Sequence, residues 1–140
     1  MTEKSTTPDV VELTRRAVEA AERGDWDAVV SFFAPHAVWD MSPQSLGVFE
    51  GRPAIRGFFE DWWRAYEELA VEVDEVLDFG NGVGVRVITQ RGRLAGGGGE
   101  VSQRSADVFL WVDGLIERVT AYLDIDAARA AADRLAEERG

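Results

Sequence analysis

Three turn signals divide the second half of the chain into four stretches with the character of β-strands. Asn81-Gly82, Gly96–Gly99 and Asp113-Gly114 each lie between segments in which apolar residues alternate with others. Asn-Gly and Asp-Gly pairs favour the left-handed backbone of tight hairpin turns, and alternation with a period of two is typical of a half-buried strand. The region from about residue 71 to 123 is therefore predicted to be an antiparallel meander of four strands.

The first half of the chain has helical periodicity instead. Apolar residues recur every three or four positions over residues 10–21 and again over 26–33, which predicts two amphipathic helices. Pro53 opens a third helix, a short strand is expected at 36–41, and Asp124 can cap an alanine-rich final helix. Helices that precede a meander indicate an α+β domain rather than a doubly wound α/β fold.

Length and charge narrow the class of protein. The chain has 140 residues, which suits one domain, and we expect that domain at residues 9–140 behind a flexible tail at 1–8. The excess of 26 acidic over 15 basic residues gives a net charge of −11. Because such a surface repels phosphate backbones, we expect no nucleic-acid partner.

Residue types that are missing or rare exclude further classes. There is no cysteine and only one histidine, so the sequence predicts neither a disulfide nor a metal site built on those ligands. No apolar run is long enough for a membrane span, and the polar start of the chain is not typical of a signal peptide. We expect a cytoplasmic protein with no membrane partner.

Three strings, at residues 22–40, 50–62 and 113–126, carry a resemblance to a known family. ERGDWDAVVSFFAPHAVWD, EGRPAIRGFFEDW and DGLIERVTAYLDID occur in the order found in the SnoaL-like branch of the nuclear transport factor 2-like superfamily. The resemblance implies an α+β cone with three N-terminal helices packed in a curved antiparallel sheet, plus a C-terminal helix, around an apolar pocket. Relatives include ketosteroid isomerases, limonene epoxide hydrolases, polyketide cyclases and members without an assigned activity.

The resemblance to ketosteroid isomerases covers part of their catalytic set. Where those enzymes carry their base, this chain has Asp40-Met41, and a gapless pairing puts Met41 in the pocket with Asp40 one step away. Their oxyanion-hole tyrosine pairs with Ala17, so that donor is missing, whereas their protonated carboxylic acid pairs with Asp107. The paired aspartates and bridging arginine of the epoxide hydrolases are absent from the matching positions.

The resemblance also implies which strand faces line the pocket, because side chains alternate between the two faces of a sheet. It assigns the odd-numbered residues of the last three strands to the pocket, and the aromatic residues of the first half to its opposite side. The expected ligand-binding residues are Trp39, Met41, Phe59, Trp63, Thr89, Arg91, Phe109, Val119, Ala121 and Leu123.

Asp107 is the first catalytic candidate, because it shares a strand face with Phe109 and Trp111. A carboxyl group among aromatic rings must be paired or protonated, and a protonated one could serve as a general acid/base. The alternative is an ordinary ion pair with Arg91 or Arg104. Asp40 is a second catalytic candidate, which would face the pocket only if its strand is bulged.

Three functions remain open from the sequence. The first is an isomerase, cyclase or hydrolase that needs no cofactor and acts on an apolar, ring-containing small molecule. The second is a binding module that holds such a molecule without transforming it, and the third is a structural dimer with a filled cavity. A homodimer is expected through the apolar outer sheet face, which comprises Ala106, Val108, Leu110, Val112, Ile116 and Tyr122.

Overall fold

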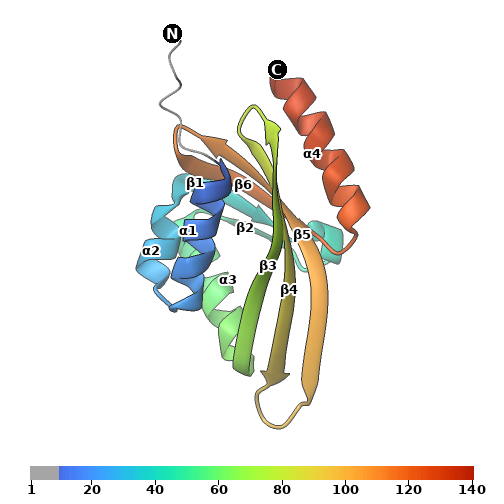
Figure 1. Cartoon of the computed structure of the whole chain (residues 1–140). Helices are drawn as coiled ribbons and strands as arrows, with labels where there is room; N and C mark the ends of the chain where they lie inside the picture. The colour runs from blue at the N-terminus through green and yellow to red at the C-terminus, as the bar shows by residue number, and fades with distance from the viewer. Residues whose placement is uncertain (1–9) are drawn as a thin grey trace.

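The computed structural model describes residues 10–140, so the tail expected at residues 1–8 lies outside the described residues. Four α-helices and six strands follow the α+β order expected from the sequence (Figure 1). The elements are α1 (Val10–Glu22), α2 (Trp26–Ser31), β1 (Phe33–Asp40), the 3-10 helix η1 (Ser42–Gln44), β2 (Val48–Glu50), α3 (Arg52–Arg64), β3 (Tyr66–Gly80), β4 (Val83–Leu94), β5 (Glu100–Val112), β6 (Leu115–Tyr122) and α4 (Ile125–Arg139).

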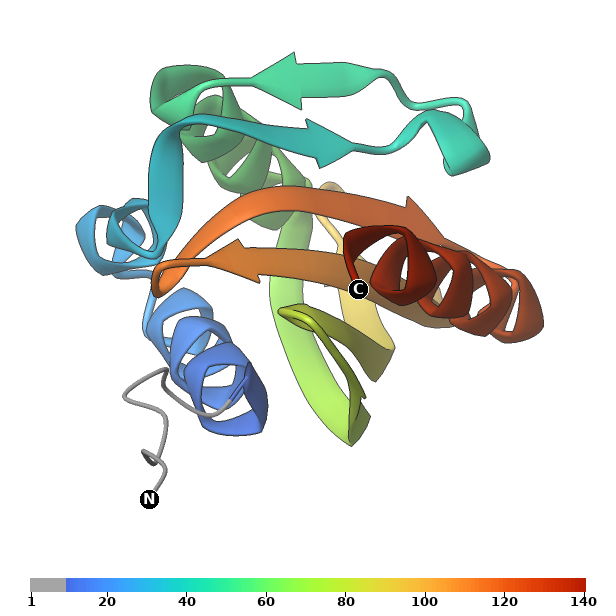
Figure 2. The same ribbon diagram turned by 90° about the horizontal axis from the view of Figure 1, so that it is seen from above.

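All six strands belong to one curved sheet with the order β2-β1-β6-β5-β4-β3 (Figure 2). The last four form the expected antiparallel meander, but β1 pairs with β6 in parallel, as in the register Trp39 to Val119. The expectation of a wholly antiparallel sheet is therefore wrong. No hairpin joins β1 to β6, so nothing local imposes an antiparallel direction on them.

The tight turn between β3 and β4 has the backbone that its sequence favours. Asn81 and Gly82 both have positive φ, at 58° and 83°, as a two-residue hairpin turn requires. The Gly82 carbonyl accepts a hydrogen bond of 2.8 Å from the Trp111 backbone N–H. A Cβ atom at Gly82 would collide with the Trp111 carbonyl oxygen, so glycine is required here both for φ and for the close approach of β5.

Two features of the first half differ from expectation. α2 ends at Ser31, earlier than the expected 33, and β1 begins at Phe33 rather than at residue 36, so Pro35 lies inside a strand. The pairing of β1 with β6 is irregular between Phe33 and Val38, and such an irregularity tolerates a proline that cannot donate to the ladder. The short strand β2 lies within the stretch that follows Asp40, where no strand was expected.

The two faces of the sheet are covered by different helices. α1, α2 and α3 lie on one side of the sheet and α4 on the other (Figure 1). Phe33, Ile55, Phe109 and Ile116, each at most 2% exposed, belong to the larger core on the first side. The burial of these side chains holds the three helices against the sheet.

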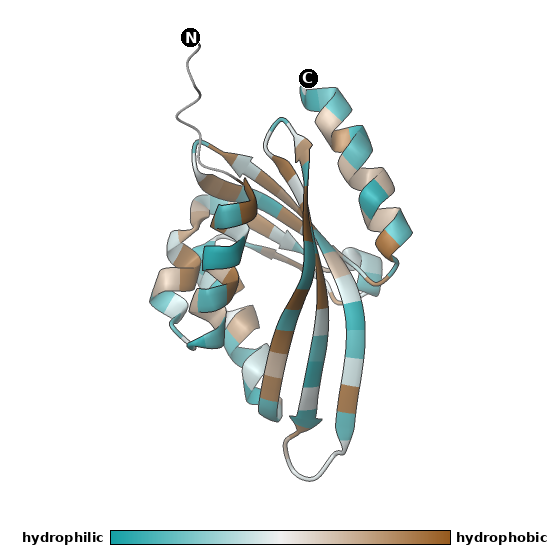
Figure 3. Ribbon diagram, viewed as in Figure 1, coloured by the Kyte–Doolittle hydropathy of each residue, from teal (hydrophilic) through white to brown (hydrophobic). Residues whose placement is uncertain are grey.

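α4 covers part of the outer face that was expected to form a homodimer. Ala128, Ala132 and Ala136, at helical spacing, pack with Val108 and its neighbours on β4 and β5. The α4 ribbon alternates between teal and paler segments, as befits a helix with one apolar side (Figure 3). Because the small alanine side chains let the helix approach the sheet, much of this apolar face is already buried within the chain.

Ile116 was expected on that outer face but lies in the inner core. The register of β5 against β6 shifts between Leu110 and Trp111, and an extra residue in one strand reverses the face of everything beyond it. Neither Ile116 nor the part of the sheet beneath α4 is therefore available for a homodimer contact through the outer face.

Candidate functional site

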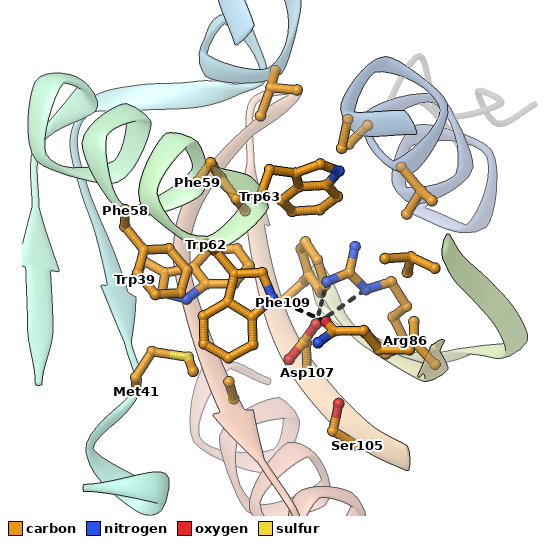
Figure 4. Close-up of a pocket in the computed structure, with 18 of the residues that line it drawn as sticks. Trp39, Met41, Phe58, Phe59, Trp62, Trp63, Arg86, Ser105, Asp107 and Phe109 are labelled. Carbon is orange, nitrogen blue, oxygen red and sulfur yellow. Dashed lines mark hydrogen bonds and ion pairs between the residues drawn. The ribbon is translucent and has the colours of Figure 1, made fainter. Parts of the chain in front are cut away.

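The main pocket lies between α3 and β1 on one side and the inner faces of β4 and β5 on the other (Figure 4). It encloses a cavity of about 90 Å³. Aromatic and aliphatic side chains make up most of its lining. The expected residues that line it are Trp39, Met41, Phe59, Trp63, Asp107, Phe109 and Ala121.

The aromatic side of the pocket is presented by α3. This helix begins after Gly51 with a proline in its first turn, and residues one turn apart then share its inner face. Phe58 and Trp62 are 5.6 Å apart between ring centroids, and Phe59 lies edge-on to Trp39 at 4.8 Å. These packed rings give the pocket a stiff apolar wall.

The opposite side of the pocket is a polar strip on β4 and β5. Arg86 pairs with Asp107 across the two strands, and Gln90 pairs with Gln103 nearer the far end. Gln90 Oε1 accepts a hydrogen bond of 3.1 Å from Trp62 Nε1. This bond ties the polar strip to the aromatic wall.

Asp107 is buried in an ion pair with Arg86 rather than alone. Arg86 Nε donates to Asp107 Oδ2 at 3.1 Å, and Arg86 Nη2 donates to the same oxygen. The two side chains are 13% and 5% exposed, and the guanidinium carbon lies 5.0 Å from the centroid of the Phe109 ring. The guanidinium lies directly against the buried carboxyl group, so the two form a buried, hydrogen-bonded ion pair.

This geometry changes the expectation for Asp107. The expected arginine partners were Arg91 and Arg104, but Arg86 is the partner. The hypothesis of an acid without a cationic neighbour is wrong for this structure. One atom of each partner has no hydrogen bond within residues 10–140, namely Arg86 Nη1 and Asp107 Oδ1.

Thr89 and Arg91 do not line the main pocket, which is a correction to the expected face of β4. Thr89 Oγ1 donates to Asp74 at 2.6 Å, and Arg91 forms an exposed ion pair with Glu72 at 3.1 Å. β4 pairs with β5 in the register Arg91 to Ser102, one residue from the pairing of Arg91 with Gln103 that would put Thr89 and Arg91 on the same face as Asp107. Since faces alternate with a period of two, that single step turns Arg86 inward and Thr89 and Arg91 outward.

Val119 and Leu123 also lie outside the pocket lining. Val119 is fully buried in the inner core but is not among the residues that line the cavity. Leu123 lies just beyond the end of β6 and is 50% exposed, because the strand alternation that pointed it inward stops at Tyr122.

Asp40 lies on the face of β1 opposite to Trp39 and does not line the pocket. Its Oδ1 accepts from the Ser42 N–H at 2.8 Å, and its Oδ2 accepts from Arg118 Nη2 at 2.5 Å. Burial acts to raise the pKa of the Asp40 carboxyl, but hydrogen bonds from Ser42 and Arg118 outweigh it and lower that pKa. Met41, not Asp40, is the residue that the strand end presents to the cavity.

Several pocket residues were not identified from the sequence. Ser105 and Gln103 share the face of Asp107 by simple alternation, so the same pattern that singled out Asp107 contained them. Arg86 faces inward only in the actual register, and its apolar neighbours in sequence pointed to the wrong face. The overlooked lining residues include Phe58, Trp62, Arg86, Gln90, Gln103 and Ser105, as well as several residues of α1.

The described part of the chain offers no ready cation site and no spanning helix. Within residues 10–140, no group of three or more histidine, aspartate or glutamate side chains is arranged to hold a metal ion. No helix there is long and apolar enough to cross a membrane.

The family follows from comparison with known proteins. The SnoaL-like domain model matches residues 14–119. The chain belongs to the SnoaL-like domain family. No curated protein matches it.

Solved structures share the fold of this SnoaL-like protein at low sequence identity. An NTF2-like protein of unknown function from Burkholderia pseudomallei K96243 is 21% identical, with a TM-score of 0.72, over 86% of this chain and 95% of that one. A Mycobacterium tuberculosis protein in complex with estradiol-17beta-hemisuccinate is 16% identical, with a TM-score of 0.70, over 84% and 95%. The epoxide hydrolase/cyclase-like enzyme SalBIII, of salinomycin pyran ring formation, is 21% identical, with a TM-score of 0.71, over 84% and 92%. These likenesses show the fold.

Proposed function

We propose that this SnoaL-like protein binds a small, apolar, ring-containing molecule in the pocket between α3 and the β4–β5 strip. The observation that carries the proposal is a cavity with a wall of packed aromatic rings on one side and a buried ion pair, Arg86–Asp107, on the other. Small-molecule sites are commonly apolar enclosures with a few convergent polar groups. The steroid ester bound by the M. tuberculosis relative is consistent with a ring-shaped ligand.

The size of the cavity limits the ligand. About 90 Å³ is below the roughly 300 Å³ at which drug-sized pockets begin and below the ~150 Å³ cavity that takes benzene in an engineered protein. The pocket would therefore accept one ring at most, and only with an outward shift of a flexible lining side chain such as Met41. The small volume also supports the competing role of a structural scaffold with a filled cavity, which predicts no binding.

Catalysis is the second candidate, and one observation favours it. Asp107 Oδ1 lines the pocket without a hydrogen-bond partner among residues 10–140. An isomerase, cyclase or hydrolase that needs no cofactor would use this oxygen to accept a substrate proton, because Oδ2 already accepts two hydrogen bonds from Arg86. A carboxylate committed to a structural pair fits binding better, so we rank binding first.

A titration with toluene tests the proposal. Binding is monitored by nuclear magnetic resonance through the indole N–H signals of the five tryptophans. Trp39 and Trp62 line the pocket, so their signals should shift in a saturable way. Ala121→Leu should remove the shifts by filling the cavity, since Ala121 is a buried lining residue.

Ala130→Leu is the matched control, since Ala130 is exposed on α4, and it should bind toluene as the unaltered chain does. Thermal unfolding of each variant first establishes that it is folded. Absence of any saturable shift in the unaltered protein, or equal binding by Ala121→Leu, would overturn the proposal in favour of the filled scaffold.

A further inference from the structure

The free edge of the Arg86 guanidinium is the polar group best placed to recognise a ligand, and this inference rests on the proposed binding function. Nε and Nη2 are both committed to Asp107 Oδ2, whereas Nη1 has no hydrogen-bond partner within residues 10–140. In Figure 4, Nη1 carries no dashed line and points toward the side of the pocket where Trp63 lies. Asp107 and the Phe109 ring together fix the guanidinium plane, so this donor is oriented before a ligand arrives.

Other donors in the pocket are less suited to this role. Trp62 Nε1 already donates to Gln90. Trp39 Nε1 has no hydrogen-bond partner within the described residues, but it is buried. The Ser105 hydroxyl, the Trp63 indole and the Gln103 amide also line the pocket without a hydrogen bond to the described residues, so they compete with Arg86 as anchors, but none of them is held in place by an ion pair as Arg86 is.

The charges around Arg86 decide to which kind of ligand oxygen its Nη1 would donate a hydrogen bond. Asp107 neutralises the guanidinium, so the pair as a whole is uncharged, and the chain carries a net charge of −11. A carboxylate ligand would bring an unbalanced negative charge into an apolar pocket, facing the free Asp107 Oδ1. A neutral carbonyl oxygen accepts from Nη1 without that penalty, and a ligand without an acceptor leaves Nη1 unsatisfied.

We propose that Arg86 Nη1 makes the pocket selective for a cyclic ligand with a neutral carbonyl oxygen, against carboxylates and plain hydrocarbons of the same shape. Arg86 is then the specificity-determining residue, and Asp107 acts through it as the group that positions the guanidinium and cancels its charge. The aromatic wall of α3 packs against the ring of the ligand, and Arg86 Nη1 donates a hydrogen bond to its carbonyl oxygen.

Three ligands of similar ring size test this selectivity: cyclohexanone, methylenecyclohexane and cyclohexanecarboxylate. Methylenecyclohexane replaces the ketone oxygen with a CH₂ group and keeps the ring. Dissociation constants are measured on the full chain from the tryptophan indole N–H signals. For each variant, the dissociation constants of two ligands are expressed as a ratio. When these ratios are compared between variants, the different hydration free energies of the compounds cancel.

The variants remove the donor or its neutralising partner. In Arg86→Met/Asp107→Leu, which removes both charges together, the preference for cyclohexanone over methylenecyclohexane should fall about tenfold or more, as expected for a hydrogen bond from a charged donor. In Asp107→Asn, the guanidinium is no longer neutralised, and the ratio of carboxylate to ketone affinity should rise about tenfold. Either variant alone carries the test if the other does not fold.

Two further variants identify the group responsible. Arg91→Gln is the control, because it removes an exposed arginine from the other face of β4, and it should leave all ratios unchanged. Ser105→Ala removes a competing hydroxyl from the pocket lining and tests whether that hydroxyl, rather than Arg86, carries the preference for the ketone.

The outcomes separate this inference from the proposed function. If no ligand of the three binds, the binding proposal itself fails. If all three bind but the ratios are the same in every variant, or if Ser105→Ala alone abolishes the ketone preference, the pocket binds rings and the role of Arg86 is overturned. A shift confined to the Arg86 and Asp107 variants supports it.

Discussion

Two buried aspartates on opposite faces of the same sheet meet their arginines in different ways. Asp107 lies in the inner pocket with Arg86, whose side chain is only 13% exposed, whereas Asp40 lies on the outer side with Arg118, whose side chain is 46% exposed. Both carboxylates are themselves well buried, at 5% and 11% side-chain exposure. The difference therefore lies in the partner: one cation is enclosed with its anion, and the other reaches solvent.

The hydrogen bonding of the two carboxylates differs as well. Both oxygens of Asp40 have partners, the Ser42 N–H on one and Arg118 on the other. Asp107, which lines the pocket, has hydrogen bonds to the described residues only at Oδ2, and its Oδ1 has no partner among them. A fully satisfied carboxylate is typical of a structural role, while a half-satisfied one beside a cavity is a candidate for contact with a ligand.

The largest expected effect is that of removing one partner from the inner pair. Asp107→Ala should lower the free energy of unfolding by about 3–5 kcal/mol, because it leaves the Arg86 charge buried and unpaired. Arg86→Met/Asp107→Leu should recover most of that loss, since it buries no charge. Urea unfolding measures the free energy of unfolding of both variants. If Asp107→Ala is no less stable than Asp40→Ala, the comparison between the inner and outer pairs fails.

Removing the outer carboxylate should cost less. Asp40→Ala should lower the free energy of unfolding by about 1–2 kcal/mol, because Ser42 loses a hydrogen-bond acceptor while the half-exposed Arg118 can turn to water. The same urea experiment measures it. A loss as large as that of Asp107→Ala would show that Arg118 is more enclosed than its 46% exposure indicates.

Acid should act on the outer pair in a direction set by the lowered pKa of Asp40. At pH values between the lowered pKa of folded Asp40 and the usual value of 3.8, the unfolded chain binds more protons than the folded one. The stabilisation of the folded state by the ionised Asp40 is therefore complete above pH 3.8 and is lost as the pH falls through the pKa of the folded protein. Wild-type protein should therefore lose more unfolding free energy below about pH 4 than Asp40→Asn. Parallel pH profiles for the two proteins would contradict the assignment.

The smallest effect is expected for an exposed pair on the same sheet. Arg91→Gln breaks the Arg91–Glu72 pair, in which both side chains are 64% exposed, and should change the free energy of unfolding by less than about 0.5 kcal/mol. This variant extends the comparison to a third degree of exposure. A loss above 1 kcal/mol would mean that the exposure of the arginine does not govern the cost.

Local patterns in the sequence predicted more of the fold than of the site. Turn chemistry at Asn81-Gly82 and helical spacing in α1 and α3 act over a few residues, and the structure has the corresponding elements. The early end of α2 was missed. The short strand β2 was also missed, because a three-residue strand is stabilised only by its pairing with β1. Seven of the expected residues line the cavity, and it was the resemblance to the family that assigned their strand faces and the aromatic residues of the first half to the pocket.

The errors came from pairings between distant residues. The face of β4 depends on how many residues the glycine-rich hairpin takes up, and a run of glycines does not specify that number. The resemblance placed the odd-numbered residues of this strand inward, but Val83, Val85 and Val87 are buried on the outer side with α4. A sheet covered on both sides has apolar residues on both faces, so hydropathy alone could not tell one from the other.

The amino-acid sequence by itself determined the α+β order, the turns, and the placement of Asp107 with Phe109 and Trp111 on a single strand face, because each depends on neighbours a few residues apart. Only the tertiary structure decided that Arg86 is the partner of Asp107, that Asp40 lies outside the pocket, and that α4 covers the outer sheet. Those outcomes depend on strand register and on helix docking over long sequence separations, where a shift of one residue reverses which side chains face the pocket.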